Sequence, residues 1–121
     1  MTTATAENLN EDMILLEHLP FELDGGIAAR ASIGLIVLAT DYTVEHEWQH
    51  IFNKVNGVAL YHSRIFNDDV ITPESLRAME PRITASTELI TPDTDLDVVA
   101  YGCTSASMAI GEENVFRNIR K

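Results

Sequence analysis

Asp97-Val98-Val99-Ala100-Tyr101-Gly102-Cys103-Thr104-Ser105-Ala106-Ser107 runs from an apolar strand pattern into a cysteine, three hydroxyl residues and a predicted helix. Cys103 is the only cysteine of the chain. A strand that passes directly into a helix is typical of parallel α/β sheets, and a helix N-terminus is where a thiolate is best stabilised. Cys103 is therefore the first candidate for a reactive residue.

Two segments upstream also have the pattern of strands. Residues 33–39 form a continuous apolar run, and residues 58–61 form a shorter one. A run that is apolar throughout is typical of a parallel strand covered on both faces. Between them, apolar residues recur at helical spacing over residues 44–55, and Asn56-Gly57 is a helix stop signal.

The second half of the chain repeats this alternation. After a predicted loop over residues 63–69, Thr72-Pro73-Glu74 begins a helix that Pro81 should kink or restart. A turn, a third strand over residues 96–101 and a third helix over residues 105–119 follow. The sequence predicts an α/β fold, an open parallel sheet with helices on both faces.

Residues 1–31 differ from the rest of the chain. They are rich in Thr and Ala at first and acidic later. We expect an extension outside the α/β domain, which spans residues 32–121. The extension is either a disordered tail or an arm that packs onto another subunit.

Charge and composition exclude several classes of function. A net charge of −11 would repel a phosphate backbone, so nucleic acid is not an expected partner. No window of about 18 apolar residues could span a bilayer, and the acidic start lacks the basic residues of a secretory signal. A single cysteine also excludes an internal disulfide. We therefore expect a cytoplasmic protein that does not contact membranes.

The candidate site is the carboxyl edge of the predicted sheet, where ligands bind in such folds. Cys103 is the candidate catalytic thiolate. The backbone N–H groups that follow it could hold a carboxylate or a developing enolate. The candidate substrate-binding residues follow the first and third strands: Thr40, Asp41, Tyr42, Thr104 and Ser105.

Each candidate also has a structural interpretation. A cysteine that ends a strand is often only a small buried residue, and an acid such as Asp41 at a helix start is commonly a cap. His62 and Arg64 could bind a carboxylate, although a histidine at a strand end is usually structural. The remaining histidines form no pattern typical of a metal site, so we expect no metal.

Several motifs occur together in one order: Ile33-Gly34-Leu35-Ile36-Val37, Thr43-Val44-Glu45, His62-Ser63-Arg64, residues 70–79 and residues 97–105. Over residues 32–121 this series resembles the first half of the maleate cis-trans isomerase and arylmalonate decarboxylase group of the aspartate/glutamate racemase superfamily. Leu35-Ile36-Val37-Leu38-Ala39-Thr40-Asp41 is most similar to the ectoine-utilization branch of that group.

The resemblance implies a Rossmann- or flavodoxin-like half of a two-domain, cofactor-independent racemase or isomerase. Its substrate would be a small carboxylic acid or amino-acid derivative, in ectoine degradation, held between two thiols from the two halves. Cys103 matches the first thiol, and the second cysteine is absent from these 121 residues. Asp41 stands where maleate isomerases have an asparagine, which favours a substrate with an amine or amidinium.

A different class of function stays open. The chain could be a non-catalytic module that binds a small acid or assembles with another subunit, or an inactive fragment without the second thiol. A half-domain exposes a sheet edge or helix faces meant for its missing half. We therefore expect self-association into a homo-oligomer.

Overall fold

The computed structural model describes residue 14 and residues 16–120. The strands form one parallel sheet in the order β2-β1-β3. This confirms the predicted α/β class and the open parallel sheet. The elements in chain order are β1 (Ala31–Leu38), α1 (Val44–Phe52), β2 (Val58–Ile65), α2 (Pro73–Arg77), η2 (Glu80–Arg82), α3 (Ile83–Glu88), β3 (Val98–Tyr101), α4 (Thr104–Ile110) and α5 (Glu112–Ile119).

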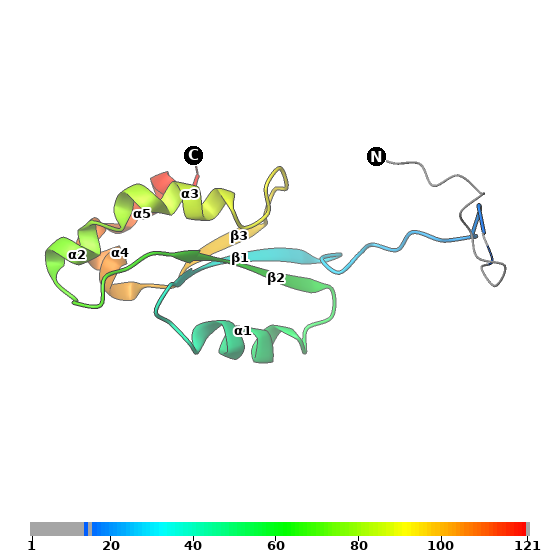
Figure 1. Ribbon diagram of the computed structural model, residues 1–121, viewed down its shortest axis with the longest axis horizontal. Coiled ribbons are helices and arrows are strands. Elements are labelled where there is room, and N and C mark those ends of the chain that lie inside the picture. Colours follow the sequence, from blue (N-terminus) through cyan, green and yellow to red (C-terminus); the bar gives the residue numbers. More distant parts are fainter. Residues whose placement is uncertain (1–13, 15, 121) are drawn as a thin grey trace.

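The helices lie in two layers. α1 covers one face of the sheet, and α2 to α5 cover the other (Figure 1). The chain steps from β1 to β2 in one direction and then back past β1 to β3. Right-handed crossovers that run in opposite directions place their helices on opposite faces. The reversal also creates a switch point between the carboxyl ends of β1 and β3, as in flavodoxin-like sheets.

The sheet has a buried core on each face. Successive strand residues point to opposite faces, which is why β1 is apolar throughout. Leu35 and Val37 are buried on the α1 face. The core on the other face joins β1 and β2 to the helices through Ile36, Ile65, Met79, Ile83, Ile90, Ala106, Ile110 and Val115.

β2 is longer than the sequence predicts. Ser63 and Arg64, expected in a loop, lie in the strand, which pairs with β1 as far as Leu38 opposite Ile65. The prediction was wrong because both polar side chains find distant partners. Ser63 Oγ donates to the carbonyl of Ser86, and Arg64 donates to carbonyls at the end of β1.

The structure interrupts the predicted second and third helices, each at one place. The expected restart at Pro81 is confirmed, since η2 contains Pro81 and separates α2 from α3. The single helix predicted over residues 105–119 was wrong, because α4 and α5 meet at Gly111 with φ at 92°. Glycine adopts a positive φ at little cost, and a right-handed helix cannot continue through such a residue.

Residues 16–30 hold no helix or strand and lead away from the sheet (Figure 1). The rest of the predicted extension, residues 1–13 and 15, lies outside the described residues. Among the described residues, we find no helix with the length and apolar character needed to cross a membrane.

Candidate functional site

A pocket of about 270 Å³ lies at the carboxyl edge of the sheet. Larger hollows beside the turn after α3 and on α1 contain no predicted site residue. The pocket brings together three predicted residues, Thr40, Cys103 and Ser105, from the switch point between β1 and β3. Its other walls come from the end of β1, the loop after β2, α2 and the residue before η2, with Leu38, Asn67, Asp68, Asp69, Ile71, Ser75, Leu76 and Met79.

Cys103 is half-buried and is the N-cap residue of α4, at the junction of strand and helix that the sequence predicts. Its sulfur accepts a hydrogen bond from the N–H of Ala106 at 3.4 Å. Its carbonyl accepts from the N–H and the hydroxyl of Ser107. The cysteine therefore occupies the position that serine or threonine commonly takes in a cap, and it is one of the residues that line the pocket.

Tyr101 lies near the thiol on the same strand end. Its hydroxyl contacts the sulfur of Met79 at 3.8 Å. Burial and, to a smaller extent, the charge of Cys103 raise the pKa of the Tyr101 phenol well above its ordinary value. The phenol therefore stays protonated at neutral pH. Sequence reasoning did not single out Tyr101, which lines a separate hollow beside α5 and not this pocket.

Asn67 was also missed, and it holds Thr40 in place. Asn67 Nδ2 donates to Thr40 Oγ1 at 2.9 Å, and Asn67 Oδ1 accepts from the Thr40 N–H at 3.3 Å. Asp68 and Asp69 follow and place negative charge on the pocket wall. The available signal was their position after the second strand, at the same sheet edge as Thr40 and Cys103.

Three other predicted residues do not line this pocket. Asp41 Oδ1 accepts from the N–H groups of Thr43 and Val44 at 2.7 and 3.0 Å, so Asp41 holds the turn into α1, whose N-cap residue is Thr43. Tyr42 is 89% exposed. Thr104 faces a separate hollow beside α5.

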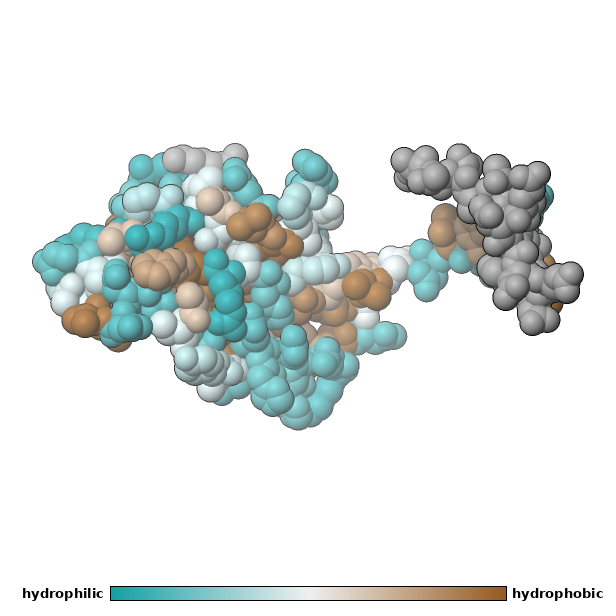
Figure 2. Space-filling model, viewed as in Figure 1, coloured by the Kyte–Doolittle hydropathy of each residue, from teal (hydrophilic) through white to brown (hydrophobic). Residues whose placement is uncertain are grey.

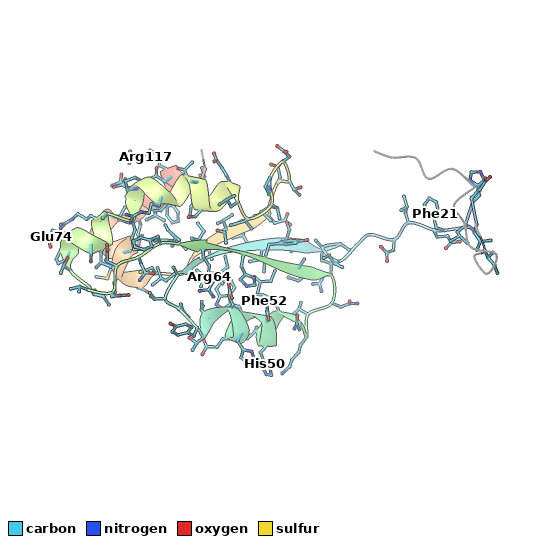
Figure 3. All side chains as sticks on the ribbon, in the orientation of Figure 1. Phe21, His50, Phe52, Arg64, Glu74 and Arg117 are labelled. Atoms are coloured by element: carbon cyan, nitrogen blue, oxygen red, sulfur yellow. The ribbon has the colours of Figure 1, made fainter. Side chains whose placement is uncertain are left out.

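Arg64 makes structural contacts at the end of β1 and with α1. Its guanidinium donates to the carbonyls of Leu38, Ala39 and Asp41 and pairs with Glu45 at 3.0 Å. Figure 3 shows Arg64 between the sheet and α1. These contacts tie the end of β1 to the start of α1. His62, the other residue considered for carboxylate binding, does not line the pocket either.

Replacing Asp41 with alanine is expected to lower the free energy of unfolding by about 1 kcal/mol, because its hydrogen bonds to the turn into α1 are lost. Hydrogen bonds from the backbone of Val44, then of Thr43, hold the pKa of Asp41 below its ordinary value of 3.8. This stabilisation is present above the unfolded pKa and is lost as pH falls through the lower folded pKa. Urea unfolding at several pH values should show the two proteins converging in acid. A pH-independent difference would contradict the assignment.

Replacing Gly102 with alanine is expected to lower the free energy of unfolding by about 1–3 kcal/mol. A Cβ at Gly102 would lie 2.8 Å from the carbonyl oxygen of Ile36, and backbone atoms cannot turn aside. The strand-to-helix turn must shift, so alkylation of Cys103 should also change in rate. Gly111→Ala, at the far end of α4, is the control that strains the backbone and leaves the alkylation rate unchanged. Equal alkylation rates in all three proteins would contradict the prediction.

Within the described residues, no group of three or more His, Cys, Asp or Glu side chains is placed to hold a metal ion. Comparisons of the chain with protein-family models, with curated proteins and with solved structures find no match.

Proposed function

We propose that this chain is the α/β half of a cofactor-independent racemase or isomerase, in which Cys103 moves a proton at the Cα of a small amino-acid derivative. One observation carries the proposal. Cys103 lies at the start of α4 and is one of the residues that line a pocket at the switch point of the sheet. The resemblance to the maleate isomerase and arylmalonate decarboxylase group supports the same role for this thiol. The single cysteine supports a cytoplasmic location.

The pocket lining favours a substrate with both an amine and a carboxylate. Asp68 and Asp69 attract a cationic group, since opposite charges stabilise each other at short range. The hydroxyls of Thr40 and Ser105 can donate hydrogen bonds to a carboxylate. The amine preference inferred from Asp41 is therefore better supported by the two aspartates after β2. A ring-opened ectoine derivative would carry both groups.

The proposed step is a balanced proton transfer on one face of the substrate. The thiolate takes the Cα proton, and the electron pair of that C–H bond moves into the carboxylate to give an enediolate. The thiol then exchanges its proton with water and returns one to the same carbon. Inversion needs a second acid on the opposite face, which the resemblance assigns to another half. This chain alone should therefore exchange Cα hydrogen with retention of configuration.

The test is solvent deuterium uptake. The chain is incubated in D₂O with a panel of amino-acid derivatives, including N-acetylated diaminobutyrates, and Cα deuteration is followed by NMR. Uptake faster than in buffer, without loss of optical purity, supports the proposal. An uptake rate equal to that of buffer across the panel would contradict it.

A second candidate is a non-catalytic module that binds a small acid or assembles with another subunit. Apolar side chains after β2 favour it, because Phe66, Val70 and Ile71 are 59%, 70% and 75% exposed. Exposed apolar groups beside a pocket suit a subunit contact. Ligand binding measured by calorimetry without any deuterium uptake would favour this function over the first.

A further inference from the structure

The segment before the sheet has the pattern of a strand. Leu19, Phe21 and Leu23 alternate with Pro20, Glu22 and Asp24. A period of two is typical of a strand with one buried face, and proline restricts it to an edge position. The three apolar side chains are 64%, 81% and 89% exposed. Figure 3 shows Phe21 far from the α/β body, so the described part of its own chain leaves this face uncovered.

One edge of the sheet offers a matching groove. β2 is an outer strand, without a further partner in the described chain. Beside it lies a groove of about 430 Å³, lined by residues 58–61 of β2, by Gln49, Phe52 and Asn53 of α1, and by Ile27. Because four successive strand residues line the groove, it follows the strand edge. An open edge presents unpaired N–H and C=O groups, to which an extended segment can add.

The charges near the two outer strands favour the β2 edge over the β3 edge as the docking site for this segment. Arg30 donates to the carbonyl of Asn56 just before β2, and Lys54 lies beside His50 near the end of α1. No acidic residue lines the groove. The described part of the segment, residue 14 and residues 16–24, is acidic and has no Lys or Arg. The hollow beside β3 instead contains Glu88, Asp93 and Asp95, which would repel an acidic segment. In Figure 2, hydrophobic surface is visible between α1 and the sheet near the base of the arm, and again on the arm.

We propose that Leu19–Asp24 of one copy adds as a strand to the outer edge of β2 in a second copy, with Phe21 and Leu23 covered beside Phe52. Asp24 accepts a hydrogen bond from the Gly26 N–H at 2.7 Å, in a turn from which the segment leads away from its own sheet. Reciprocal exchange between two copies covers both arms in a closed dimer. This inference is independent of Cys103 and its pocket.

The first test is the oligomeric state of the full chain by analytical ultracentrifugation. We expect a dimer whose dissociation constant rises at least about tenfold in Phe21→Asp, which corresponds to about 1.4 kcal/mol. The matched control is Leu89→Asp, because Leu89 is 69% exposed after α3 and lies outside the groove. That variant should dimerise like the unmodified chain. A chain that stays monomeric at every concentration, or dimers unaffected by Phe21→Asp, would overturn the proposal.

The second test identifies the edge and the partner. Glu22→Lys and Lys54→Glu should each weaken the dimer, and the double variant should recover part of the loss. Hydrogen exchange should show protection of residues 58–61 that grows with concentration and disappears in Phe21→Asp. Protection that is independent of concentration would mean docking within one chain and would overturn exchange between copies. Concentration-dependent protection of β3 in place of β2 would also overturn the proposal.

Discussion

Cys103→Ala is expected to slow Cα deuteration by at least about 100-fold, because a positioned general base contributes about 10²- to 10⁴-fold. The substitution removes the only thiol among the residues that line the pocket. Rates are measured by NMR in D₂O at a fixed pH and substrate concentration. Uptake that persists unchanged in Cys103→Ala would remove the thiol from the mechanism.

Two control variants separate chemistry from structure. Serine is a good helix cap, so Cys103→Ser should keep the start of α4 and the unfolding temperature while the deuteration rate stays low. Met108→Ala alters an exposed side chain on the same helix and should leave the rate unchanged. Recovery of the rate in Cys103→Ser would show that the sulfur acts only as a cap.

Ile36→Ala is expected to lower the free energy of unfolding by about 2–5 kcal/mol. Ile36 is 0% exposed, and it packs in the core between β1 and the helices that carry the site. Alanine leaves a cavity that neighbouring groups fill only in part. Typical domains unfold at about 5–15 kcal/mol, so the loss is a large share of the total.

Urea unfolding followed by circular dichroism measures this loss. Ile71→Ala is the control, because Ile71 is 75% exposed and its truncation should change stability by no more than about 0.5 kcal/mol. Equal midpoints for Ile36→Ala and Ile71→Ala would contradict the assignment of Ile36 to the core.

Local signals in the sequence were enough to predict the central strand and the helix restart. The apolar run of residues 33–39 and the proline at position 81 act on their own neighbours, and the structure has the central strand and the helix restart there. Other boundaries depend on distant partners. Ser63 and Arg64 were predicted to lie in a loop, because the carbonyls that accept their hydrogen bonds lie elsewhere in the chain.

The residues considered for the site also divide into those with local contacts and those with distant partners. The role of Asp41 in the turn into α1 is local, since its carboxylate accepts hydrogen bonds from amides two and three residues ahead. Asn67 and the aspartates after it join Thr40 only because the carboxyl ends of β1 and β2 lie side by side. The spacing of these residues along the chain does not indicate that contact.

The order of apolar and polar residues was sufficient to establish an α/β sheet and to place Cys103 where a strand becomes a helix, because both depend on short-range periodicity. The pocket around that sulfur depends on the strand order β2-β1-β3, which gathers three separate loops at one edge. The surroundings of Thr104 likewise depend on α5, because residues of that helix form part of the hollow that Thr104 lines.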